Sequence, residues 1–112
     1  MNIHSNKWIF QDSVTAPANG EVLESGRADT VTLFITGTSA TRTIYFEGSD
    51  NEGNWYSIPA FKLPTLTMAS STTGNNEAWE IDLTDSVYVR ARVSAVAGGT
   101  VRITGRVVNS NG

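Results

Sequence analysis

The stretch from residue 30 to residue 36 reads Thr-Val-Thr-Leu-Phe-Ile-Thr, and it decides the fold class. Its apolar side chains Val31, Leu33 and Ile35 recur at every second position, with three threonines and Phe34 on the opposite face. Successive side chains of a β-strand point to opposite faces, so this alternation predicts a strand with one buried face. The same alternation returns in residues 43–47, 78–83, 87–93 and 100–107.

Turn residues separate these segments, and no segment of useful length has helical periodicity. The pattern predicts an all-β protein, an antiparallel, jelly-roll-like β-sandwich of about seven or eight strands. We expect residues 30–36, 43–47 and 54–58 to form two successive hairpins. We also expect residues 87–93 and 100–107 to pair across Gly98-Gly99. The inner row of that hairpin would contain Val87, Val89, Ala91 and Val93 facing Val101, Ile103 and Val107.

The chain of 112 residues is long enough for one hydrophobic core, so we expect one sandwich domain over residues 28–112. Residues 1–27 would be an N-terminal arm, or a first strand followed by a linker. An arm would dock on a neighbouring molecule through Trp8 and Phe10. Pro59 and Pro64 predict an edge piece or loop between them. The polar run from Ser70 to Asn76 predicts a long exposed loop suited to partner contacts.

Composition argues against several classes of function. The formal net charge of -3 gives no attraction to phosphate backbones, so nucleic acid is not an expected partner. No cysteine is present, and no apolar run approaches the length of a membrane span. The N-terminal residues lack an apolar run behind Lys7, so we expect synthesis in the cytoplasm and no membrane partner.

Two clusters of acidic residues have spacings that bear on catalysis or metal binding. Glu80 and Asp82 lie two apart on one predicted strand face, a separation compatible with glycosidases, but a solvated face is the favoured interpretation. The oxygen-rich residues around Asp50 suggest Ca²⁺ ligands, yet Trp55 stands where an EF-hand requires glycine, so a hairpin turn is favoured. His4 is the only histidine. We therefore expect no enzyme activity, no cofactor and no bound metal.

Two groups of side chains are candidates for binding. Trp55 and Tyr56 are adjacent, so on a strand one would enter the core while the other could stack on a sugar ring. Arginines at four positions would project from the outer face of the 87–107 hairpin: Arg90, Arg92, Arg102 and Arg106. Clustered guanidinium groups need carboxylates, supplied either by Glu80 and Asp82 on an adjacent strand or by another subunit.

Residues 43–58 read Thr-Ile-Tyr-Phe-Glu-Gly-Ser-Asp-Asn-Glu-Gly-Asn-Trp-Tyr-Ser-Ile, followed later by Trp79-Glu80-Ile81-Asp82. The chain closes with Val89-Arg90-Ala91-Arg92-Val93 and the Gly-Gly-Thr-Val-Arg-Ile-Thr-Gly run of residues 98–105. Over about residues 29 to 109 this pattern resembles small β-sandwich virion proteins of tailed bacteriophages. Two departures are an Asn-Glu insertion in the turn and a segment up to Arg27 with no counterpart.

The resemblance implies a structural protein of a phage particle: a capsid decoration, collar, tail or fibre component located in the virion. Proteins of this kind commonly form rings or trimers, so we expect a homo-oligomer that also contacts other phage structural proteins. The alternative is a carbohydrate-binding module that recognises a cell-surface glycan through Trp55 or Tyr56.

Overall fold

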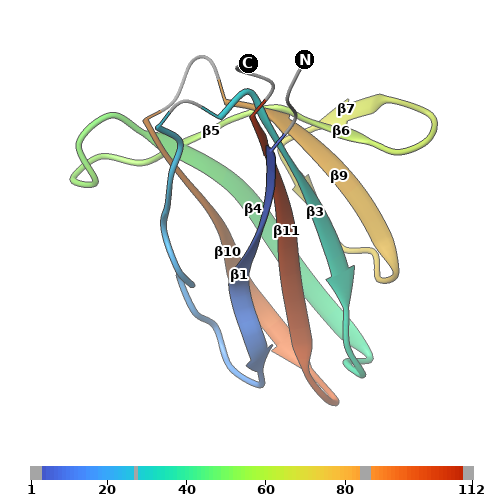
Figure 1. Cartoon of the computed structure of the whole chain (residues 1–112). Helices are drawn as coiled ribbons and strands as arrows, with labels where there is room; N and C mark the ends of the chain where they lie inside the picture. The colour runs from blue at the N-terminus through green and yellow to red at the C-terminus, as the bar shows by residue number, and fades with distance from the viewer. Residues whose placement is uncertain (1–3, 27, 84–86, 110–112) are drawn as a thin grey trace.

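The computed structural model describes residues 4–26, 28–83 and 87–109, which form eleven β-strands in two antiparallel sheets (Figure 1). The predicted all-β sandwich is confirmed. The described residues contain no helix, and hence no helix long and apolar enough to cross a membrane. The strand count exceeds the expected seven or eight because five of the strands are only two or three residues long.

The larger sheet has six strands in spatial order β1 (His4–Val14), β11 (Val101–Asn109), β3 (Thr30–Thr36), β9 (Glu77–Asp82), β6 (Ala60–Lys62) and β7 (Thr67–Ala69). The smaller sheet contains β2 (Leu23–Glu24), β10 (Tyr88–Ala97), β4 (Thr41–Ser49) and β5 (Tyr56–Ser57), with β8 (Ser71–Thr72) also paired to β4. Each sheet therefore mixes strands from both halves of the chain.

The core lies between the sheets and is built from the alternating rows. Val31, Leu33 and Ile35 of β3 are fully buried, as the 30–36 pattern predicts. From the other sheet, Phe46 of β4 meets Trp79 of β9, with ring centroids 5.2 Å apart and planes inclined by 43°. Such tilted aromatic pairs add packing energy beyond the apolar area they bury. The Trp79 row is thus inward, as predicted.

Two predicted hairpins are wrong. Strands β10 and β11 lie in different sheets: β10 pairs with β4, whereas β11 pairs with β1 and β3. Gly98 and Gly99, with φ of 75° and 144°, carry the chain from one sheet to the other. The two valine rows therefore face each other across the core, and Val87 is not in the row because it is 45% exposed. Likewise β3 and β4 lie in different sheets, while β4 does pair with β5.

The N-terminal segment contributes a full strand. β1 pairs with β11 from His4↔Asn109 to Val14↔Val101, with irregular register after Ile9 and after Gln11. Phe10 is fully buried, and a Cβ built on Gly105 would come within 2.7 Å of its ring. Glycine at that position of β11 therefore makes room for Phe10. The prediction that Phe10 contacts a partner is wrong, because its ring is part of this core.

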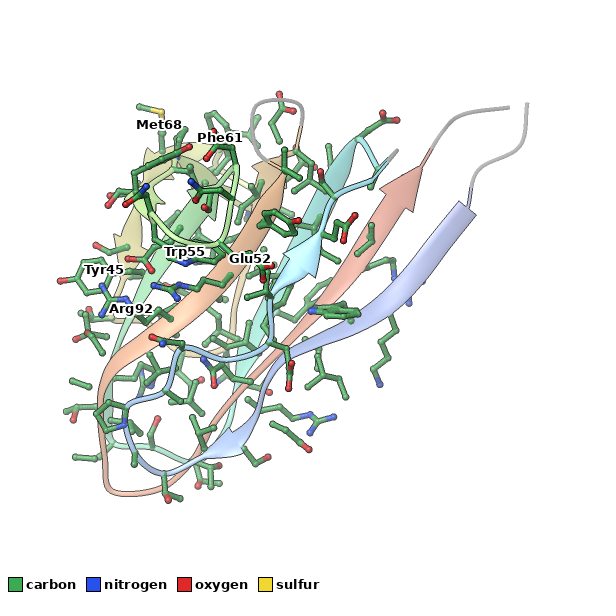
Figure 2. The ribbon with its side chains drawn as sticks, turned by 90° about the vertical axis from the view of Figure 1, so that its left-hand side faces the viewer. Tyr45, Glu52, Trp55, Phe61, Met68 and Arg92 are labelled. Carbon is green, nitrogen blue, oxygen red and sulfur yellow. The ribbon has the colours of Figure 1, made fainter. Side chains whose placement is uncertain are left out.

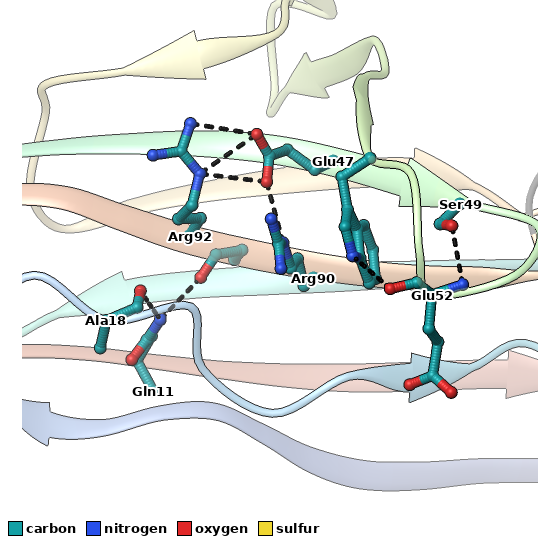
Figure 3. A network of polar contacts seen from close by, with 9 residues as sticks. Gln11, Ala18, Glu47, Ser49, Glu52, Arg90 and Arg92 are labelled. Carbon is teal, nitrogen blue, oxygen red and sulfur yellow. Dashed lines mark hydrogen bonds and ion pairs between the residues drawn. The ribbon is translucent and has the colours of Figure 1, made fainter.

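Gln11 joins the two sheets at the edge formed by β1 and β10. Its amide group is buried and donates from Nε2 to the carbonyl oxygens of Ala91 (2.8 Å) and Ala18 (3.0 Å) (Figure 3). Ala18 in turn forms a backbone bridge with Val93 of β10. The segment that the sequence presented as a linker is thereby held against the smaller sheet.

Replacing Gln11 with alanine is expected to lower the free energy of unfolding by about 1–2 kcal/mol, because the buried carbonyl of Ala91 and the part-buried carbonyl of Ala18 each lose the hydrogen bond from the Gln11 amide. Urea denaturation followed by tryptophan fluorescence measures the change. Asn19→Ala, at an exposed position of the same segment, is the control and should change stability by less than about 0.5 kcal/mol. An equal effect of both substitutions would show that Gln11 does not join the sheets.

The structure also differs from the predictions for two loops, residues 70–76 and the segment between Pro59 and Pro64. The run from Ser70 to Asn76 is mostly half-buried rather than exposed: it includes β8, and Arg42 donates to the Thr73 carbonyl at 2.9 Å. It packs on β4 and is a poor candidate for partner contacts. Between the two prolines, β6 pairs with β9 on one side and β7 on the other, so the edge position belongs to β7.

Candidate functional site

The outer face of the smaller sheet carries a group of charged and aromatic side chains that contact one another. Strands β10 and β4 are in register at Arg90↔Glu47 and Arg92↔Tyr45. Because Val89, Ala91 and Val93 fill the core, the alternation directs the two arginines to the other face. Trp55, just before β5, joins them, and these five side chains are called the Arg–Glu cluster below: Tyr45, Glu47, Trp55, Arg90 and Arg92.

Glu47 is the centre of the cluster. Its Oε1 accepts a hydrogen bond from Arg90 Nε at 2.9 Å, and its two oxygens accept bonds from Arg92 Nε and Nη2 at 3.1 Å (Figure 3). The side chains of Glu47 and Arg90 are 10% and 14% exposed, and that of Arg92 is 32% exposed. Charge-assisted hydrogen bonds between partly buried side chains are stronger than those of a solvent-exposed ion pair.

Aromatic rings flank the two guanidinium groups. The Arg90 guanidinium carbon lies 4.1 Å from the centre of the Trp55 ring, and that of Arg92 lies 4.9 Å from the Tyr45 ring. Both are cation–π distances. Figure 2 shows Tyr45 and Arg92 side by side, on the side of the molecule away from β1. The cluster is therefore a rigid surface of alternating rings and charges.

The prediction that either Trp55 or Tyr56 enters the core is wrong. Trp55 is half-buried beneath Arg90 on the outer face, and Tyr56 is 50% exposed. Residue 55 lies outside any strand, so strand alternation does not apply to the pair. One face of the Trp55 ring is taken by Arg90, which leaves Tyr56 as the freer of the two rings.

The acidic turn before Trp55 is organised by its own side chains. Ser49 Oγ accepts from the Glu52 amide at 2.9 Å, and Asn51 Oδ1 accepts from the amides of Gly53 (2.8 Å) and Asn54 (3.0 Å). Trp55 Nε1 donates to the Glu52 carbonyl at 3.2 Å and ties the turn to the cluster. These bonds explain the Asn- and Asp-rich composition as a capped turn. In the described ranges, no three His, Asp or Glu residues gather as metal ligands.

The Arg–Glu cluster also fixes the charge of Glu47. Burial by itself raises the pKa of Glu47, but the hydrogen bonds and charges of Arg92 and Arg90 outweigh it and lower the pKa below 4.5. The pKa of Arg92 is raised chiefly by its hydrogen bond to Glu47. Glu47 is therefore ionised at neutral pH, so it serves as an acceptor and holds no proton for acid catalysis.

Stability should depend on pH through Glu47. Because its pKa is lower in the folded than in the unfolded chain, its contribution is present above about pH 4.5 and is lost as pH falls through the folded value. Urea midpoints measured between pH 7 and pH 3 should fall on acidification, and Glu47→Gln should flatten that fall. If the variant follows the same pH curve as the parent, the lowered pKa is not coupled to folding.

The remaining predicted site residues lie elsewhere. Arg102 and Arg106 are on β11, in the opposite sheet, where Arg102 pairs with Asp12 of β1. The prediction of four arginines on one hairpin is therefore wrong. Trp8 is half-buried at the rim of the core, and its Nε1 has no acceptor within the described structure.

The expected acidic partners of the arginines were also wrong. Glu80 and Asp82 lie on β9, which pairs with β3 and β6 and not with β10. The acidic partner of Arg90 and Arg92 is instead Glu47, which lies on β4. Its outward position follows from the 43–47 alternation, but its meeting with Arg90 and Arg92 requires knowing that β4 pairs with β10.

A groove of about 460 Å³ lies beside the irregular part of β1. Ile9, Phe10 and Val14 form its apolar part, and Asp12 and Glu21 bring carboxylates to it. The remaining wall consists of Gln11, Ala18 and Gly20. Its size lies within the range of small-molecule and side-chain pockets.

Comparison with known proteins agrees with this fold. A model of the XepA family matches residues 4–107, which include the strands of both sheets and the Arg–Glu cluster. The chain belongs to the XepA family. The SPbeta prophage-derived protein YomS of Bacillus subtilis (strain 168) is 30% identical over 102 residues, which are 91% of this chain and 86% of YomS.

Two further relatives are longer. XepA of the phage-like element PBSX of Bacillus subtilis (strain 168) is 26% identical, and YqxG of the same strain is 25% identical. The chain spans 37% of XepA and 34% of YqxG, so about a third of each. The match thus corresponds to one part of those proteins.

Solved structures share the architecture. The crystal structure of YomS superposes with a TM-score of 0.93 at 28% identity, covering 97% of this chain and 96% of YomS. The crystal structure of the PBSX exported protein XepA gives 0.92 at 24% identity, covering 97% of this chain and 39% of XepA. The chain is therefore a XepA-family sandwich related to proteins of Bacillus prophages and phage-like elements.

Proposed function

We propose that the chain is a structural component of a tailed-phage particle that acts through protein–protein contacts and without catalysis. The relationship to prophage-derived YomS over nearly the whole of both chains carries this proposal. The Arg–Glu cluster supports it, since Trp, Tyr and Arg dominate the energetic centres of protein interfaces. A fixed array of this kind loses little side-chain entropy on docking.

The proposal is tested on particles from cells that carry the phage. Particles are banded in a density gradient and their proteins quantified by mass spectrometry against the major capsid protein. We expect this chain in the particle band at a constant ratio through two successive gradients. Because XepA is described as an exported protein, the medium before lysis is also assayed. Accumulation there, with none in the particles, would overturn the proposal.

A glycan-binding role is the second candidate, and the 50% exposure of Tyr56 favours it. The ring lies at the edge of the smaller sheet next to the Arg–Glu cluster, where it can stack on a sugar face. A glycan array probed with the parent protein and with Tyr56→Ala tests this role. Binding that the substitution abolishes would support it, and an array without any bound saccharide would remove it.

A further inference from the structure

We propose that the groove beside β1 binds a lysine side chain, an ammonium ion on an aliphatic stem, that a different protein presents. Only the source of this lysine rests on the proposed function, in which the chain contacts other proteins. The chemistry of the groove does not depend on it, because it follows from the side chains of the lining. A buried oxygen, an unbalanced charge and an apolar wall each restrict what the groove can hold.

The lining of the groove contains a buried hydrogen-bond acceptor without a donor. Gln11 is only 2% exposed, and its Nε2 donates to the carbonyl oxygens of Ala18 and Ala91 (Figure 3). Because both neighbours are acceptors, the orientation of the amide is fixed and Oε1 is its free end. No described residue donates to Oε1. The polar side-chain atoms of the described structure that lack both a partner and solvent are Trp8 Nε1 and Asn75 Oδ1, so Gln11 Oε1 opens into the groove.

The groove also carries negative charge and no side-chain donor. Asp12 and Glu21 bring two exposed carboxylates to it. Arg102 pairs with Asp12, which leaves one unbalanced negative charge. Since both protons of Gln11 Nε2 are used, no side chain of the described lining has a donor to offer a ligand. A ligand must therefore supply the donors, and one positive charge balances the site.

Apolar side chains form the rest of the groove. Ile9 and Val14 are half-buried in the lining, and Ala18 lies with them. The volume of about 460 Å³ is larger than an ammonium group alone requires. A lysine side chain matches this combination, because its methylene stem packs on apolar surface while its ammonium group reaches polar partners.

Two other cations fit the groove less well. The acceptor groups are Gln11 Oε1, the Glu21 carboxylate and the Asp12 carboxylate that Arg102 already occupies in part. A guanidinium brings five N–H donors in one plane, more than these groups satisfy, whereas an ammonium brings three. Ca²⁺ takes six to eight oxygen ligands, and no three His, Asp or Glu residues gather as ligands in the described ranges. The compact ammonium is therefore the cation that the groove fits.

The backbone around the groove has an irregular shape that keeps it open. β1 loses regular register with β11 after Ile9 and after Gln11, and Ser13 has a φ of 56°, in the left-handed region. Gly20, with φ of 78°, passes so close to β1 that a Cβ would lie 2.4 Å from the Phe10 carbonyl oxygen. Bulges and non-glycine residues with positive φ concentrate at functional sites. A groove shaped by the main chain is preformed, which reduces the cost of binding.

Titration with short peptides, followed by nuclear magnetic resonance, tests the chemistry of the groove. The isotope-labelled full chain is titrated with a glycine-lysine-glycine peptide blocked at both ends. Matched peptides carry Nε-acetyl-lysine, norleucine or arginine instead of lysine, and calcium chloride is titrated alone. We expect the lysine peptide to shift the side-chain amide signals of Gln11 and the backbone signals of Val14 and Gly20. Each matched peptide should bind at least about tenfold more weakly.

Two variants of the groove should change the affinity for the lysine peptide in opposite directions. Glu21→Gln removes the unbalanced charge and should weaken binding at least about tenfold. Arg102→Gln frees the Asp12 carboxylate and should tighten binding about threefold, and loss of so exposed an ion pair leaves the fold intact. Circular dichroism checks the fold of both. Glu52→Gln, in an exposed turn, changes the net charge as Glu21→Gln does and should bind like the parent.

The source of the lysine is tested on purified phage particles. A carbodiimide joins a carboxylate to a lysine amine that touches it, forming an amide bond with loss of one water. We expect it to link Glu21 or Asp12 to a lysine of a different protein, identified by mass spectrometry after digestion. The lysines of this chain itself are Lys7 and Lys62, so links within or between its copies are recognised by their peptides.

The outcomes separate the inference from the proposed function. Shifts around the groove that the lysine peptide alone produces, with opposite effects of the two variants, would support the lysine site. No shift there, equal binding of a matched peptide, or tighter binding of calcium would overturn it. Particles that contain the chain but give links only to Lys7 or Lys62, or none, would overturn the different-protein source. Particles without the chain would overturn the proposed function, while the peptide titration still decides the chemistry of the groove.

Discussion

Replacing Phe10 with alanine is expected to lower the free energy of unfolding by about 3–5 kcal/mol, the usual cost of deleting a buried aromatic ring. Phe10 is fully buried and its ring lies against Gly105 of β11, so its loss leaves a cavity between β1 and the rest of the core. Equilibrium denaturation with urea measures the change. An effect of this size would exceed a third of the stability of many small domains.

The matched control is Phe34→Ala on β3 of the same sheet. Its ring is 41% exposed on the outer face, so we expect a loss of about 1 kcal/mol or less. If residues 4–14 were instead a detachable arm, Phe10→Ala would leave the urea midpoint unchanged and alter only self-association. That result would contradict the placement of β1 in the core.

Removing the carboxylate of Glu47 should have the second largest effect. Glu47→Ala would leave Arg90, only 14% exposed, without its anion, and we expect a loss of about 3 kcal/mol. Trp55 stacks on Arg90, so the Asp50–Asn54 turn should loosen as well. Hydrogen exchange of the Gly53 and Asn54 amides would report that loosening alongside the stability measurement.

Glu52→Ala provides the control for Glu47→Ala, since Glu52 is an exposed carboxylate in the adjacent turn and only its backbone groups are bonded. Its removal should change stability by less than about 0.5 kcal/mol. A double-mutant cycle of Glu47→Ala with Arg92→Ala then isolates the coupling between the pair. Equal effects of Glu47→Ala and Glu52→Ala would mean that the cluster contributes nothing to folding.

Much of the fold follows from the sequence because strand alternation is a local property. The rows around Leu33, Trp79 and Ile103 are buried as their spacing predicts, and these rows define the two inner faces. Alternation says which face of a strand is buried but not which strand lies beside it. A Gly-Gly pair is compatible with a hairpin turn and equally with a crossing between sheets, so the β10–β11 pairing was misassigned.

The candidate site could not be predicted without knowing which strands are neighbours. Arg90 and Arg92 were identified from the sequence, but their partner Glu47 lies 43 residues from Arg90 and 45 from Arg92 along the chain. Only the pairing of β4 with β10 brings them together. Gln11 and Gly20 were missed for a similar reason, because an isolated glutamine or glycine in a predicted linker carries no local signal of the tertiary contact it makes.

We expect this sandwich to work through contacts with further copies of itself. Sedimentation velocity of the unmodified protein over a hundredfold range of concentration, about 1 to 100 µM, spans the affinities of transient and stable contacts. We expect the mass to rise with concentration to a fixed multiple of 12.0 kDa. A single species of 12.0 kDa throughout the range would contradict the claim.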